Sequence, residues 1–264
     1  MLTSLHNHTT WSDGETDVAQ VVAEAERHGL DEVGISDHYA LTPDGKRVEW
    51  SMPLPRLSEY VEDLQRVAAR TQRVVLRLGV EADFFPETAE QLGKLLRAHP
   101  FDYVIGSVHF LGDFKIDSSA SDWQVLSPDE CNGKWSLYWQ RIREMAESGT
   151  FDIAAHLDLP KKFGFRPTVD QSVEEGAALD AIAASGMSIE INTAGWYKPC
   201  EEAYPSLNLL EEAHKRRIPL MINADAHSPL HLTRDFDGAR ALARRAHYTE
   251  LVSYIGREQI VNAL

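Results

Sequence analysis

Two histidines near the start of the chain, His6 and His8, have the spacing of a pair of metal ligands. They follow a short, partly apolar stretch that predicts a buried strand, and residues i and i+2 of a strand point to the same side. Asp13 follows after a short loop and can turn back to add a carboxylate oxygen. Imidazole nitrogens beside a carboxylate suit zinc, manganese or iron. Taken alone, the pair could equally be two surface histidines.

Similar side chains recur directly after later predicted strands. They are His38, Glu81, His109, His156, Asp225 and His227. One histidine at such a position is more often a hydrogen-bonded core residue than a ligand. Nine polar side chains in one interior need partners, however, and metal ions can partner them together. Nine ligands favour two or three ions over one, and Glu81 has two oxygens with which to bridge.

Short apolar stretches alternate with amphipathic segments along the whole chain. The predicted strands are 1–5, 32–36, 74–80, 103–108, 151–155, 187–191 and 218–223, with a last strand at 251–255. The predicted helices are 16–28, 56–71, 88–99, 135–147, 172–185, 205–216 and 237–247. Seven strand–helix repeats predict an α/β fold with a parallel sheet and right-handed crossovers. An open doubly wound sheet would gather polar residues at one crevice. Because each strand ends in a polar residue, we favour a closed barrel in a single domain, residues 1–264.

The composition narrows the class of partner. The chain has 264 residues, with 26 Lys and Arg against 41 Asp and Glu, and a formal net charge of −15. We expect no nucleic-acid partner, because the phosphate backbone requires a basic surface. Two cysteines and the lack of a long apolar run predict a cytoplasmic protein without a membrane span. The polar segments 39–55 and 111–133 follow strands that end in candidate ligands, so we expect them to border the substrate.

In their order along the chain, the candidate ligands resemble those of the PHP family, named for polymerase and histidinol phosphatase. The matching motifs are His6-Asn7-His8, Asp13, Asp37-His38, Glu81, Gly106-Ser107-Val108-His109, His156 and Asp225-Ala226-His227. The resemblance covers nearly the whole chain and implies a distorted (β/α)7 TIM-like barrel with a trinuclear metal site. The implied sets are His6, His8, Glu81 and Asp225 for one ion, Glu81, His109 and His156 for a second, and Asp13, His38 and His227 for the third.

Aspartate at position 13, where some members have histidine, resembles the histidinol-phosphatase branch of the family. The stretches 156–166 and 190–195 resemble that branch too. The resemblance implies a metal-dependent phosphoric monoester hydrolase that converts L-histidinol phosphate to L-histidinol and phosphate in histidine biosynthesis. Its cofactors would be two to three divalent ions, zinc, iron or manganese. The alternative is another phosphoesterase of the family, acting on nucleotides, oligonucleotide ends or phosphotyrosine. A non-catalytic metal-binding module should have lost ligands, and none of the nine is missing.

Three cations follow the candidate ligand His156 closely. Arg166 offers a planar fork suited to phosphate oxygens, and we expect it to bind substrate and to neutralise charge during catalysis. Lys161 and Lys162 are candidates for the same task, or they belong to a solvated face. Asn192, at the end of the sixth strand, could donate to phosphate or cap a turn.

Two further roles can be assigned to residues near the predicted metal site. Asp225, as a ligand beside the nucleophile, is our candidate catalytic carboxylate for handling a proton. Trp50 and Trp123 lie in the two polar segments. Either could offer an aromatic face to an imidazole, or simply hold its own loop in place.

Overall fold

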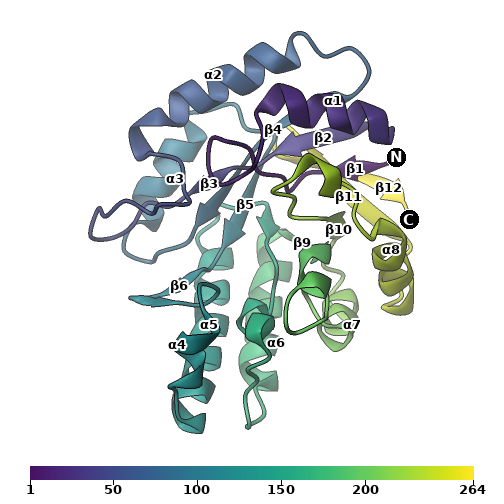
Figure 1. Ribbon diagram of the computed structural model, residues 1–264. Coiled ribbons are helices and arrows are strands. Elements are labelled where there is room, and N and C mark those ends of the chain that lie inside the picture. The colour runs from purple at the N-terminus through teal and green to yellow at the C-terminus, as the bar shows by residue number, and fades with distance from the viewer.

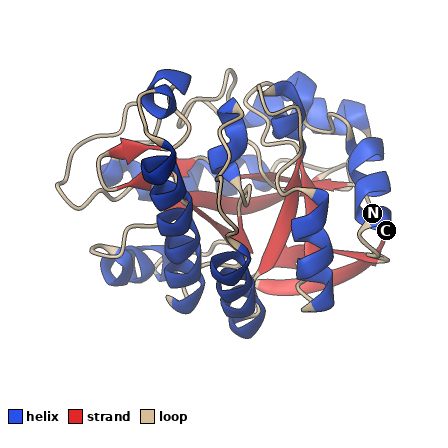
Figure 2. Ribbon diagram, turned by 90° about the horizontal axis from the view of Figure 1, so that it is seen from below, coloured by secondary structure: helices blue, strands red, loops and turns tan.

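A parallel sheet curls into a near-closed barrel with helices around it (Figures 1 and 2), in a computed structural model that describes residues 1–264. Neighbouring strands, in order, are β1 (Thr3–Ser4), β2 (Glu32–Ile35), β4 (Val75–Asp83), β5 (Tyr103–Ser107), β8 (Ile153–Ala154), β9 (Ser188–Asn192) and β10 (Leu220–Asn223). A short extra strand, β3 (His38–Tyr39), pairs with the C-terminal part of β4. The barrel expected from the sequence is confirmed.

The barrel closes between β10 and β1 through residues just beyond the ends of these strands. The amide of His8 donates to the carbonyl of Ala226 at 2.8 Å, and the amide of Ala226 donates to the carbonyl of His6 at 3.2 Å. The side chain of Asn223 accepts from the amide of Leu5 at 2.8 Å. The first and last candidate ligand pairs are therefore joined by backbone hydrogen bonds.

Helices cover the outside of the barrel. They are α1 (Val18–His28), α2 (Leu57–Ala68), α3 (Ala89–Arg97), α4 (Ala120–Gln124), α5 (Pro128–Glu147), α6 (Ser172–Ser185), α7 (Leu207–Lys215) and α8 (Phe236–Arg245). In α1, Asp17 and Gln20 form a capping box, and Gly29 ends the helix at φ 69°, a conformation that favours glycine. None of the helices has the length and apolar character needed to cross a membrane.

The segment 111–133 is more ordered than its polar composition predicts. It contains most of the hairpin of β6 (Phe110–Leu111) and β7 (Phe114–Lys115), then α4 and the first turns of α5. The hydrophobic pattern predicts this helix from residue 135, but it starts at Pro128, where Ser127 and Glu130 form a capping box. Because the first turn is polar, the hydrophobic pattern begins later than the helix itself, although the capping residues mark its true start.

Apolar side chains fill the N-terminal end of the barrel interior. They form a cluster of eight buried residues, separate from the cluster of 60 between barrel and helices: Leu5, Tyr103, Ile105, Ile153, Ala155, Met221, Val252 and Tyr254. The last two belong to β11 (Glu250–Ile255), which pairs with β12 (Glu258–Ala263) in a C-terminal hairpin. The Tyr254 hydroxyl donates to the carbonyl of Asp152 at 2.8 Å. The hairpin therefore closes the end of the barrel where the strands begin.

Candidate metal centre

All nine predicted ligands lie together at the C-terminal end of the barrel. His6 and His8 follow β1, His38 is in β3, Glu81 is in β4, His109 follows β5, His156 follows β8, and Asp225 and His227 follow β10. Asp13 comes from the turn between β1 and α1. The ends of parallel strands meet at one edge of a barrel, so distant positions in the sequence become neighbours.

Glu81 stands at the centre of this cluster and is fully buried. Five histidines surround its two oxygens: His6, His8, His38, His109 and His156. Oε1 lies 3.0 Å from Nε2 of His156, and Oε2 lies 2.8 Å from Nδ1 of His38. The closeness of His38 follows from sheet register, because His38 is directly opposite Glu81 on neighbouring strands. Glu81 has the position of a bridging carboxylate.

Two aspartates complete the cluster on its more exposed side. Oδ2 of Asp13 lies 3.3 Å from Nε2 of His227, and Oδ1 lies 3.7 Å from Nε2 of His38. Oδ1 of Asp225 lies 3.2 Å from Nε2 of His8 and 3.6 Å from Nε2 of His6. Groups of three or four donor atoms close enough to hold one ion occur three times: His8, Asp13, His38 and His227; His6, His8 and Glu81; and His38, Glu81 and His109. The groups overlap at His8, His38 and Glu81; the family resemblance assigns His8 and His38 to one ion each and Glu81 to two.

Several buried polar atoms in the cluster lie close to one another but are not aligned for a hydrogen bond. They are Nε2 of His6, Nδ1 of His8, Nδ1 of His38 and Oε2 of Glu81. A buried polar atom without a partner is costly, and nearly all such atoms in proteins are satisfied. These four belong to imidazole and carboxylate groups, which are ligands for zinc and other divalent ions. The residues present therefore fit metal ions.

Burial and neighbouring charges shift the pKa values of several groups in the cluster. Burial lowers the pKa of His8 to about 3, assisted by His227 and His38, so that its imidazole is neutral. Burial also disfavours charge on His227, but Asp13 and Asp225 outweigh it and raise its pKa to about 9. His6 and His38 hold the pKa of Glu81 well below its ordinary value despite burial. The carboxylates are thus ionised, and a cation that binds the histidines must displace protons.

Two buried carboxylates that were not predicted from the sequence orient histidines of the cluster. Glu190 lies with Oε2 3.0 Å from Nδ1 of His6, and it accepts from the amide of His156 at 3.0 Å. Asp83 lies with Oδ1 2.9 Å from Nδ1 of His109. Carboxylates that bind the second nitrogen of a ligand histidine fix its ring and raise its basicity. The sequence does contain a signal for both residues. Glu190 is a charged residue inside the apolar strand 187–191, and Asp83 lies two positions after Glu81, so its side chain is on the same side of the strand.

Asp37 fixes the turn that carries Asp13. Its carboxylate accepts from the amide and hydroxyl of Thr9 and from the amide and hydroxyl of Ser12, at 2.6–3.1 Å. Gly14 is required in the same turn, because a Cβ atom there would lie 2.4 Å from the backbone carbonyl of His8. Asp37 therefore positions a ligand through the backbone.

The cluster opens into a cavity of about 590 Å³. Besides ligands, the cavity is lined by cations from three segments, namely Lys162, Lys198 and Arg234. Lys162 donates to the carbonyl of Asp117 at 2.8 Å and to its carboxylate at 3.1 Å. Lys198 and Arg234 make no ion pair. The segments 39–55 and 111–133, which were expected to border the substrate, both line this cavity, the first through Trp50 and the second through Asp117.

The other predicted substrate residues lie elsewhere. Arg166 is half exposed, pairs with Glu202 at 2.7 Å and lines a different cavity. Lys161 is fully buried and donates to Asp158 at 2.9 Å and to the carbonyl of Ala203 at 2.7 Å. The structure therefore does not bring Arg166 or Lys161 to the metal cluster. Gly164, at φ 85°, turns the chain between Lys162 and Arg166.

Asn192 is buried beside the cluster. It donates to Oδ2 of Asp225 at 3.0 Å and to Glu190 at 3.0 Å, and its own oxygen accepts from the amide of Ala194 at 3.0 Å. Asn192 therefore caps the turn, one of the two roles suggested by the sequence, and it also orients the carboxylate of Asp225.

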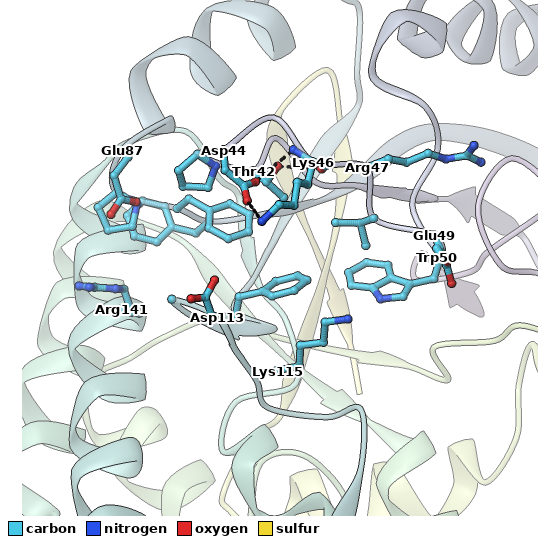
Figure 3. A pocket seen from close by; sticks show the side chains of 17 residues that line it. Thr42, Asp44, Lys46, Arg47, Glu49, Trp50, Glu87, Asp113, Lys115 and Arg141 are labelled. Atoms are coloured by element: carbon cyan, nitrogen blue, oxygen red, sulfur yellow. Dashed lines mark hydrogen bonds and ion pairs between the residues drawn. The ribbon is translucent and has the colours of Figure 1, made fainter. Parts of the chain in front are cut away.

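Trp50 lines both the metal cavity and a second cavity of about 700 Å³, which Figure 3 shows. Its ring centroid lies 4.6 Å from that of His38, 5.3 Å from that of His109 and 5.9 Å from that of Phe110. Trp123 is instead fully buried, and its indole nitrogen donates to the carbonyl of Ile116 at 2.7 Å. Of the two tryptophans, only Trp50 offers an aromatic face near the ligands.

Comparison with known proteins identifies the family of this chain. The PHP domain matches residues 4–194, and the chain belongs to the PHP family. The chain is 38% identical over 228 residues to a Deinococcus radiodurans protein named "Probable histidinol-phosphatase", covering 86% of this chain and 84% of that protein. It is 24% identical over 260 residues to the histidinol-phosphatase of Lactococcus lactis, covering 95% and 93%.

The fold has a counterpart among solved structures. The crystal structure of Lactococcus lactis histidinol phosphate phosphatase, complexed with zinc, L-histidinol and phosphate, matches with a TM-score of 0.81. The match covers 98% of both chains at 21% identity. The family membership and the barrel predicted from the sequence are both confirmed.

Proposed function

We propose that this chain is a metal-dependent histidinol-phosphatase, which hydrolyses L-histidinol phosphate to L-histidinol and phosphate in histidine biosynthesis. The observation that carries the proposal is the convergence of nine candidate ligands, with Glu81 at their centre, at the mouth of a cavity that is also lined by lysines. The choice of ester rests on the Deinococcus radiodurans relative and its name.

We assign two to three divalent ions, zinc, iron or manganese, to the nine side chains. Such ions, when bound, polarise a phosphoryl group and make water a nucleophile at neutral pH. The zinc in the Lactococcus lactis complex supports this assignment. The histidine rings are held for this task by Glu190 and Asp83, and the carboxylate of Glu81 is held between five of the rings.

Asp225 is our proposed proton acceptor. Histidines hold its pKa well below the ordinary value even though it is buried, so the carboxylate is ionised at neutral pH. Oδ2 accepts from Asn192 at 3.0 Å, which fixes the plane of the carboxylate. Asn192 is therefore proposed to orient Asp225 rather than to bind phosphate.

We propose Lys162 and Lys198, rather than Arg166 and Lys161, as the cations that bind phosphate. Lys162 and Lys198 line the metal cavity, whereas Arg166 and Lys161 are occupied by acidic partners outside it. A lysine ammonium is a compact charge that binds phosphate through single contacts. Replacement of either cavity lysine by alanine should reduce kcat/KM roughly 10- to 100-fold, the loss expected for a charged hydrogen bond.

We place the reaction in the cytoplasm, because both cysteines are free thiols, as expected in a reducing compartment. The partner should be a small phosphate monoester rather than a nucleic acid, since the net charge is −15.

A phosphate-release screen tests the proposal. Metal-reconstituted protein is offered histidinol phosphate, nucleotides, phosphotyrosine and sugar phosphates, and kcat/KM is compared. We expect histidinol phosphate to give the highest value. A higher value for any other ester would assign the chain to a different phosphoesterase of the family. The matched pair Lys162→Ala and Arg166→Ala then tests the cation, with loss expected only in the first.

A further inference from the structure

Arg234 is a third cation on the wall of the metal cavity, and no acid neutralises it. It lies between the short helix η4 (Pro229–His231) and α8, and it lines the cavity together with His227 and Lys198. Its guanidinium makes no hydrogen bond or ion pair, and its Nε is buried without a partner. Arg166, by contrast, pairs with Glu202. A buried donor without an acceptor is unfavourable unless a ligand supplies one.

Tyr197 holds the Arg234 side chain in place. The guanidinium carbon lies 4.0 Å from the centroid of the Tyr197 ring, a cation–π contact. The Tyr197 hydroxyl donates to the carboxylate of Asp235, the residue that follows Arg234. The short helix η3 (Thr193–Tyr197) also fixes the backbone, because the hydroxyl of Thr193 donates to the carbonyl of Arg234 at 2.8 Å. A cation held over a ring keeps its N–H groups available for a ligand.

The surroundings of Arg234 indicate an anionic ligand. Burial lowers the pKa of Lys198, and Lys162 and Arg234 lower it further, whereas Asp225 and Asp117 raise it, so the three cations lie within electrostatic reach of one another. Among them only Lys162 has an acidic partner, Asp117. Carboxylates also line this cavity, but neither Lys198 nor Arg234 forms an ion pair, and cations without ion pairs in a chain of net charge −15 are typical of a site that binds an anion.

We propose that Arg234, positioned by Tyr197, is a further substrate-binding residue that donates to the phosphate group of the ester. The inference rests on the proposed function for the site, but it concerns phosphate itself and not the alcohol to which phosphate is attached. The planar guanidinium of Arg234 can bind two oxygens of a terminal phosphate, whereas a single lysine such as Lys162 or Lys198 cannot. Tyr197 acts as a positioning residue.

Calorimetric titration of metal-reconstituted protein with inorganic phosphate tests the role of Arg234. We expect Arg234→Ala to raise the Kd for phosphate roughly 10- to 100-fold, and Arg234→Lys to recover part of the loss. Arg166→Ala, the matched control outside the cavity, should bind phosphate like wild type. All variants should retain the wild-type metal content. An unchanged Kd in Arg234→Ala would overturn the proposal, whereas failure to hydrolyse histidinol phosphate would leave this titration valid and count only against the choice of ester.

A double-mutant cycle tests the positioning role. Tyr197→Leu removes the ring and should raise the Kd for phosphate roughly 3- to 10-fold, whereas Tyr197→Phe keeps the ring and should have little effect. In the Arg234→Ala background, Tyr197→Leu should change the Kd no further, because its effect acts through the guanidinium. Equal effects of Tyr197→Leu in both backgrounds would show that Tyr197 does not act through Arg234.

Discussion

At the N-terminal end of the barrel the strands point apolar side chains inward, whereas at the C-terminal end they present ionisable ones. Tyr103 and Ile105 of β5 pack against Tyr254 of the C-terminal hairpin, and His109, just beyond the same strand, joins the metal cluster. The first set fills space and excludes water, which stabilises the fold through burial of apolar surface. The second set leaves buried polar atoms without hydrogen bonds. Stability and chemistry are therefore divided between the two ends.

Two candidate ligands at the polar end have strained backbone conformations. His156 has φ 21° and Asp225 has φ 51°, a region that residues other than glycine seldom adopt. Such conformations cost free energy and persist only where surrounding contacts enforce them. Here Glu190 accepts from the amide of His156, and Asn192 donates to the Asp225 carboxylate. The buried polar network thus holds two candidate ligands in positions that the local backbone disfavours.

Removing the carboxylate at the centre of the polar end should have the largest effect. Glu81→Ala takes away the group that faces five histidines, so we expect fewer bound ions and a loss of kcat/KM on the order of 10³-fold, about 4 kcal/mol. Metal analysis and phosphate release measure the two effects. Near-wild-type activity in this variant would show that Glu81 does not bridge metal ions.

The opposite end should respond in stability instead. Tyr254→Ala opens a cavity in the apolar cluster and should lower the free energy of unfolding by roughly 3 kcal/mol, measured by denaturant titration. Because the metal cluster is at the other end of the strands, kcat and metal content of the folded protein should not change. The comparison between the ends fails if this variant loses metal while it is still folded.

A smaller effect should come from the carboxylate that orients His6. Glu190→Gln keeps the shape of the side chain but removes its charge, and we expect metal affinity to fall roughly 10- to 100-fold. Competition with a chelator measures the change. Glu32→Gln is the matched control, since Glu32 begins β2 at the other end of the barrel and pairs with Arg77. Equal losses of metal affinity in the two variants would contradict a specific role for Glu190.

The convergence of the candidate ligands that follow strands was predictable, because strand ends in a parallel barrel meet at one edge. The direction of a side chain beyond the strand end was not predictable. Gly164 turns the chain, which places Lys162 in the cavity and Arg166 against Glu202. Arg234 was missed for a similar reason, since it comes seven residues after His227 and its position depends on contacts with η3. Glu190 could have been found from its place inside an apolar strand.

Metal reconstitution of the stripped protein tests the central claim most directly. Chelator-treated protein is titrated with zinc or manganese while bound metal and phosphate release from histidinol phosphate are measured together. We predict negligible phosphate release from the metal-free protein and activity that rises as two to three ions bind per chain. One ion or fewer at saturation, or full phosphate release in the presence of chelator, would contradict a metal centre built from the nine side chains.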